Sequence, residues 1–263
     1  MITCEQGGVI PWLADTSIAL LTAAIFLALY LAAGVILLVL YLLRRAGRAD
    51  AVGPLSPGLL SPLGLIFGLL VGFLVADVWS DRDKAAAAVS QEASALRDVD
   101  LLTGAFPAEQ PRIRQLLREQ IDGYVATEWP EMSGGRATLN LAPALLVEVQ
   151  GIVLGLPVQT EGQRVAQDRL ETSIDRALEA RRTRLVLSTS SIDPLRLTAL
   201  YLVAVTTLAA MACVQADRLR RAATALALLA TAMAIALTLL VAQGAPFTGY
   251  FAIDPDLLIQ VRP

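Results

Sequence analysis

Residues 61–84, SPLGLIFGLLVGFLVADVWSDRDK, combine two patterns that together predict the architecture of this chain. The stretch runs without a charge as far as Asp77 and then becomes a charged sequence in which apolar residues recur at helical spacing. The first pattern is that of a membrane-spanning helix, and the second is that of an amphipathic helix in water. The stretch therefore predicts a helix that crosses a membrane and continues as the first helix of a water-facing domain.

Small residues recur at every fourth position of this stretch, at Gly64, Gly68, Gly72, Ala76 and Ser80. This spacing places them on one helix face, where a second helix can approach closely. Two partners fit the glycines: another helix of the same subunit, which we favour, or a neighbouring subunit in an oligomer. In either case we expect a large residue at Gly68 to disrupt the packing.

The composition is that of a membrane protein and not that of a soluble domain. Apolar residues make up 56% of the 263 residues, and the mean hydropathy is +0.60. The net charge of −3 and the lack of a basic stripe give no basis for binding nucleic acid. With no histidine, and with Cys4 and Cys213 as its two cysteines, the chain is expected to hold no metal and no cofactor.

Three further apolar runs accompany the span at about residues 61–79. They cover residues 17–43, 197–216 and 222–241 and contain no charged residue. At 1.5 Å per residue, each is long enough to cross the ~30 Å hydrocarbon core. We therefore predict an all-α membrane protein with four transmembrane helices. We assign residues 1–79 to the N-terminal tail and the first two spans, 80–193 to a helical extramembrane domain, and 194–263 to the last two spans and the C-terminal tail.

The inserted segment holds most of the charged residues, and its apolar residues follow a helical period. No stretch alternates with a period of two, so we expect no sheet. Helices are predicted over residues 81–102, 111–129 and 142–156, and from about Thr160 onward, with Pro130 ending the second. Their apolar stripes are Val89, Ala93, Leu96 and Val99; Ile113, Leu116, Leu117, Ile121, Tyr124 and Val125; Leu145, Leu146, Val149, Ile152 and Val153; and Val165, Leu170, Ile174 and Leu178.

The short loops predict the orientation, because arginines in short loops stay in the cytoplasm. Neither terminal tail is basic: the N-terminal tail has no Lys or Arg, and the C-terminal tail has only Arg262. We therefore expect a multi-pass protein of a bacterial cytoplasmic membrane with both termini and the helical domain outside. The arginines of the two short loops are Arg44, Arg45, Arg48, Arg218, Arg220 and Arg221.

Charged residues flank the predicted outer ends of two spans. Asp77 is the one acidic residue near a span that could be submerged, and Arg82 and Arg196 are expected at a similar depth. Asp77 either pairs with one of these arginines, which we favour, or belongs to a ring of charges at a pore mouth, which would disfavour anions. Trp12 and Trp79 fall where an outer aromatic belt would lie.

Two polar runs in the domain have plain interpretations. The run Arg176, Arg181, Arg182 and Arg184 could attract an anionic substrate or lipid, but we favour a solvated helix face. The hydroxyl run at residues 188–191 lacks a histidine to serve as its base. No phosphate-binding glycine loop or metal cluster occurs in the sequence. We therefore expect no catalytic residue and no enzyme.

Three stretches resemble the bestrophin-like family of bacterial and plant membrane proteins. They are VWSDRDKAAAAVSQEASAL at residues 78–96, ARRTRLVLSTSSIDPLRLTAL at 180–200 and PFTGYFAIDPDLL at 246–258. The last, with Pro-Phe-x-Gly followed by Ile and Pro, is the most specific. Together with the order of two spans, helical insert and two spans, the resemblance covers most of residues 17–258. It implies no established activity.

The chain is similar, more distantly, to the true bestrophins, which are pentameric anion channels lined by their second span. Pro62 and Gly68 match the proline and inner glycine of that pore helix, and the resemblance implies that Ser61, Leu65 and Leu69 face the pore. The chain departs from the pattern in having leucines where bestrophins have aromatics. Bestrophins also hold their helical domain in the cytoplasm, whereas the arginines here predict the opposite side.

Two functions follow as hypotheses. The first, which we favour, is a homo-oligomeric channel in the lipid bilayer that passes a small inorganic ion. In it the second span lines the path, and Leu65 and Leu69 form an apolar constriction. The second is a non-conducting envelope protein whose outer helical domain binds a partner or senses a condition.

Overall fold

The computed structural model describes residues 18–46, 56, 58, 60–139, 143–189, 194–249 and 252–263. The features predicted for Trp12, Arg48 and the N-terminal tail lie outside these residues. Every regular element of the described residues is a helix, and no strand occurs among them, as predicted. The chain divides into two compact units: a membrane unit with α2, α3 through Trp79, α8 and α9, and a helical unit with the rest of the described chain.

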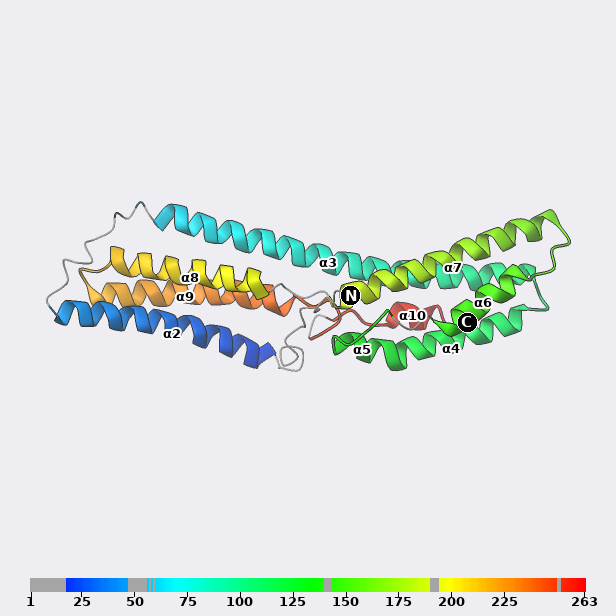
Figure 1. The fold of residues 1–263 in the computed structure, drawn as a ribbon, viewed down its shortest axis with the longest axis horizontal. Coiled ribbons are helices and arrows are strands. Elements are labelled where there is room, and N and C mark those ends of the chain that lie inside the picture. Colours follow the sequence, from blue (N-terminus) through cyan, green and yellow to red (C-terminus); the bar gives the residue numbers. More distant parts are fainter. Residues whose placement is uncertain are drawn as a thin grey trace, which may run out of the picture. The chain divides into compact units, whose positions relative to one another are not determined.

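The membrane unit consists of four helices that are long and apolar enough to cross a membrane. They are α2 (Ile18–Arg45), the first part of α3 (Leu60–Leu102), α8 (Pro194–Val214) and α9 (Leu219–Ala242). The four predicted spans are therefore confirmed to within a few residues, and Figure 1 shows them side by side. α2, α8 and α9 pack closely on one another through alanines and leucines such as Leu29, Ala204 and Leu226.

Helix α3 is a single helix of 43 residues that belongs to both units. Its continuation beyond the span confirms the prediction from the opening stretch. It begins at Leu60, so Ser61 and Pro62 lie in its first turn. Pro62 is tolerated because the first N–H groups of a helix have no intrahelical partner.

The helical unit packs the domain part of α3 against several further helices. These are α4 (Gln110–Gly123), the π-helix η4 (Tyr124–Glu128), α5 (Trp129–Ser133), α6 (Ala144–Leu154) and α7 (Glu161–Ser188), with the short η3 (Thr103–Ala105) and α10 (Asp256–Gln260). The start predicted near Thr160 is confirmed, because the Thr160 hydroxyl accepts a hydrogen bond from the Gln163 N–H at 3.2 Å.

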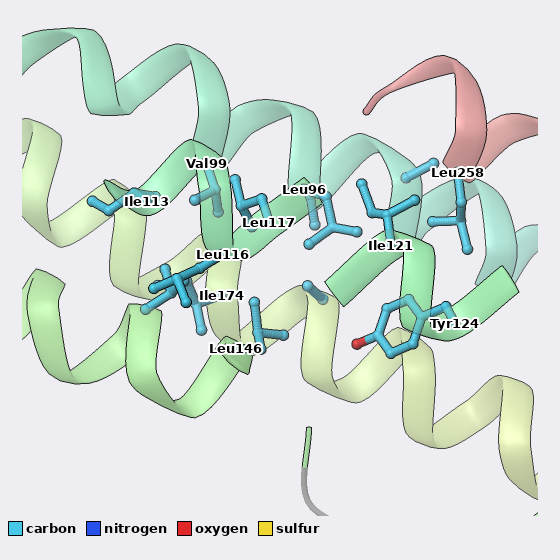
Figure 2. Packing of buried hydrophobic residues seen from close by; sticks show 14 of the residues in the cluster. Leu96, Val99, Ile113, Leu116, Leu117, Ile121, Tyr124, Leu146, Ile174 and Leu258 are labelled. Carbon is cyan, nitrogen blue, oxygen red and sulfur yellow. The ribbon is translucent and has the colours of Figure 1, made fainter. Parts of the chain in front are cut away.

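The core of the helical unit is built from the predicted stripes. Figure 2 shows Leu96 and Val99 of α3 packed with residues of α4, α6 and α7, including Ile113, Leu146 and Ile174. Val165 is an exception: its side chain is 44% exposed, and the neighbouring Ala166 is buried in its place.

Two predicted boundaries in the helical unit are wrong. Pro130 does not end the second helix, which continues through α5 to Ser133. The wide turn of η4 precedes Pro130, so the ring and the missing N–H fall where the α-helical ladder is already interrupted. The C-terminal tail, which we grouped with the last two spans, belongs to the helical unit. Its Phe247 and Leu258 are buried in that core.

Candidate functional site

The membrane part of α3 has few partners within its own subunit. None of the residues in its most apolar 18-residue window is buried, whereas 17% are buried in α2, 28% in α8 and 33% in α9. A membrane helix gains most of its packing from neighbouring helices. This part of α3 therefore has most of its surface available for a contact outside the described chain.

The faces of this helix differ in what they meet. Phe67, Val71 and Leu74 are partly buried against the core of the membrane unit. With ~3.6 residues per turn, Leu65 and Leu69 lie on the opposite face. Their side chains are 63% and 50% exposed. Ser61 shares that face and is also exposed.

Two unlike flanks separate these faces. One carries Gly64, Gly68 and Gly72, and a Cβ added at any of them would meet no atom within 4 Å. The other carries the exposed side chains of Ile66, Leu70 and Phe73. The interpretation that a helix of the same subunit packs on the glycines is therefore wrong for the described part of the chain.

An ion pair joins two of the charged side chains at the end of this span. The Arg196 Nη1 donates to Asp77 Oδ2 at 3.2 Å, which is the pairing that we favoured from the sequence. Both side chains are more than half exposed. Arg82 lies further along α3 and is half-buried. Close by, the Trp79 indole N–H donates to the Gln243 side chain just after α9, which ties α3 to the fourth span.

A cluster of four charged side chains lies inside the helical unit. The guanidinium of Arg184 is fully buried and donates to both carboxylate oxygens of Glu92, with N–O distances of 2.7 and 3.1 Å. It also donates to Glu128 Oε2 at 3.0 Å. Arg181 donates to the other Glu128 oxygen at 2.8 Å. We call Glu92, Glu128, Arg181 and Arg184 the charge cluster.

Aromatic rings enclose the charge cluster. The Arg184 guanidinium lies 4.5 Å from the Trp129 ring centroid and 5.2 Å from that of Tyr124. The Arg181 guanidinium lies 5.7 Å from the Tyr124 ring. Cations over aromatic faces are stabilised by the ring quadrupole, most strongly when water is excluded. The buried Tyr124 hydroxyl has no hydrogen-bond partner among the described residues.

Burial and pairing act on the cluster in opposite directions. Burial raises the pKa of the Glu92 carboxyl above its ordinary value, although the Arg184 guanidinium pulls that pKa down. Burial lowers the pKa of Arg184, but the carboxylates of Glu92 and Glu128 prevail and hold it above its ordinary value. Burial, with the same carboxylates, raises the pKa of Tyr124 well above its ordinary value.

The charge cluster corrects the interpretation of the arginine run. Arg181 and Arg184 do not lie on a solvated face, although Arg176 and Arg182 do. The signal was present in the sequence, because Arg181 and Arg184 continue the helical stripe of Leu170, Ile174 and Ala177. Glu92 likewise falls between Val89 and Leu96 on the stripe of α3. A charge on an apolar stripe needs a partner, but the sequence does not say which one.

Among the described residues no group of three or more Cys, Asp or Glu side chains could hold a metal ion. The charge cluster has two carboxylates, and both are already paired with guanidinium groups. The two guanidinium groups and the two carboxylates of the cluster therefore neutralise one another's charges.

These features define an all-helical membrane protein with a helical unit inserted between its second and third spans. A family model described as the bestrophin-like domain matches residues 26–258. The chain belongs to this family. No match is found among curated protein sequences.

Solved structures share the fold. A single-residue variant of a bacterial bestrophin homologue from Klebsiella pneumoniae matches with a TM-score of 0.70 and 11% identity, covering 92% of this chain and 96% of that one. The structure of that homologue obtained by Zn-SAD phasing matches with a TM-score of 0.68 and 12% identity, covering 91% and 95%. At these identities the similarity concerns the fold alone.

Proposed function

We propose that several copies of this chain assemble around the membrane part of α3 and form a channel for a small inorganic ion. The observation that carries the proposal is the exposure of Leu65 and Leu69 on the face opposite the subunit's own core. In a ring of subunits, a helix needs one face for its own subunit, one for the axis and two flanks for its neighbours. α3 has these four surfaces.

The unlike flanks support a closed ring. One flank carries three large exposed side chains, Ile66, Leu70 and Phe73. The glycine flank of the next copy has no side chains in the way, so these large residues can pack against it. A contact between two different flanks is heterologous, and heterologous contacts close into rings when the rotation allows. Leu65 and Leu69 would then repeat around the axis as an apolar constriction, which gates by excluding water.

Substitution at the constriction tests this function. In planar bilayers with the purified full-length protein, we expect a unitary current that rises several-fold in Leu65→Ala and Leu69→Ala, because a smaller apolar ring is easier to hydrate. Leu31→Ala is the matched control, since Leu31 on α2 is similarly exposed, at 59%, and lies on another helix. No current in the wild type or in either α3 variant would exclude the channel.

We further propose the orientation that the short loops predict, with the helical unit outside a bacterial cytoplasmic membrane. Alkaline phosphatase, which is active only outside the cytoplasm, reports it when inserted at Gly134–Gly135 or fused after Pro263. We expect activity at both sites and none for a fusion after Arg220 in the last short loop. The reverse pattern would place the helical unit in the cytoplasm.

A second function has one observation in its favour. Helix α6 presents Val147 and Leu154 to solvent, 48% and 62% exposed, and Leu101 at the end of α3 is 64% exposed. Exposed apolar side chains of this kind suit a protein partner. A non-conducting protein that binds a partner through its helical unit is supported if the wild type assembles but carries no current.

A further inference from the structure

The chain leaves the helical unit for the membrane unit at three stretches, which we call the passages, and the charge cluster includes residues from the helices at two of them. Glu92 belongs to α3, which passes directly into the second span. Arg181 and Arg184 lie in the last turns of α7, which is followed by α8. The third passage is the tail that follows α9, and it is held indirectly.

Trp129 links that tail to the cluster. Its indole N–H donates to the Ile253 carbonyl at 3.0 Å, and its ring meets Phe247 edge-on with centroids 6.0 Å apart. The same ring lies under the Arg184 guanidinium. Arg184, itself in α7, is therefore connected directly to α3 through Glu92 and indirectly to the tail through the Trp129 ring.

Stability alone does not explain such a cluster. Taking charges out of water is expensive, and replacing a buried ion pair with apolar residues of similar volume is often neutral or stabilising. What a fully paired buried network can add is specificity, because a shifted packing would leave a charge unpaired. The network is well paired here, since Arg184 alone makes three hydrogen bonds to two carboxylates.

The local backbone around the cluster is also unusual. Tyr124 and Glu128 begin and end η4, a π-helical turn inside an otherwise α-helical segment. Such turns often occur at functional sites. The Tyr124 hydroxyl is left without a described partner while its ring meets both guanidinium groups.

We propose that the charge cluster is a lock that selects one arrangement of the three passages, and that it contributes this specificity and not net stability. The lock holds α3, the end of α7 and the tail after α9 where each leaves the helical unit. The inference does not depend on ion conduction, and it is tested without measuring a current.

The test compares amide hydrogen exchange in two double variants of the full-length protein in lipid nanodiscs. E92L/R184M removes the central pair and leaves the Arg181–Glu128 pair in place. We expect an unchanged or higher Tm, yet exchange on the order of tenfold faster in residues 77–90, 182–189 and 240–249, because the passages lose their single arrangement. The control R112M/E148L removes an exposed pair of 2.6 Å between α4 and α6. This control variant should show wild-type amide exchange in all three passages.

A narrower variant keeps the proposal testable if the double variant does not fold. Trp129→Phe removes the hydrogen bond to Ile253 and keeps a ring at that position. We expect faster exchange in residues 240–249 and wild-type exchange in residues 77–90, a difference that general destabilisation does not produce. Wild-type exchange in all passages of E92L/R184M, or equal changes in its control, would overturn the lock. An equal change in exchange in residues 77–90 and 240–249 of Trp129→Phe would also overturn the lock.

Discussion

Arg184→Met should lower the free energy of unfolding of the helical unit by about 3–5 kcal/mol, the usual consequence of removing one partner of a buried ion pair. Methionine fills a similar volume between the rings of Trp129 and Tyr124, so the change is mainly one of charge. Glu92 would remain fully buried without the guanidinium that binds both of its oxygens. Urea unfolding of the purified protein, followed by tryptophan fluorescence, measures the loss.

Two comparisons make this result specific. Arg112→Met breaks an ion pair whose side chains are 50% and 45% exposed, and it should change stability by no more than about 1 kcal/mol. Adding Glu92→Leu to Arg184→Met should return the free energy of unfolding to the wild-type value or above it, because no unpaired carboxylate then remains at that position. If the single variant is as stable as the wild type, Arg184 does not carry a buried charge in the way the structure shows.

Gly68→Leu should prevent assembly while leaving the fold of the single subunit intact. A Cβ added at this position meets no described atom of its own subunit within 4 Å, so we expect the larger side chain to clash with a neighbouring copy. Loss of a close glycine contact between membrane helices is expected to weaken association by about a hundredfold or more, roughly 3 kcal/mol. Native mass spectrometry of the protein in detergent measures the distribution of oligomers.

Gly34→Leu provides the matched control. Gly34 is also an exposed helical glycine, and a Cβ added there would meet no described atom within 4 Å. It lies on α2, outside the proposed contact. We expect its oligomers to resemble those of the wild type. Equal assembly of the two variants would show that the glycine flank of α3 is not a subunit contact. The ring proposed for conduction would then need a different interface.

Much of the fold follows from local patterns in the sequence. The uncharged runs define α2, α8 and α9, since a membrane helix is specified by length and polarity alone. The change from apolar to charged sequence after Asp77 predicts that α3 continues into the helical unit, as it does. The period of the apolar residues predicts most of the core, including Leu96, Ile113 and Ile174.

The wrong predictions concern features that the local sequence pattern does not indicate. The sequence predicts a solvated face for Arg181 and Arg184 because their partners, Glu92 and Glu128, are far away in the sequence. It predicts a helix end at Pro130 because no local signal indicates the wide turn that precedes this proline. It gives no reason to separate the tail from the spans, because the buried position of the tail depends on Trp129, which lies in a different segment.

Sequence patterns are enough to specify an all-helical membrane protein with four spans and an inserted helical unit, because hydropathy and periodicity are properties of neighbouring residues. The residues that each helix face contacts are known only from the folded structure. The folded structure shows that the glycines of α3 have no partner within the described subunit and that two arginines of a charged run are buried in one network. Such contacts join residues distant in the sequence, and their energies depend on burial, which a linear pattern does not encode.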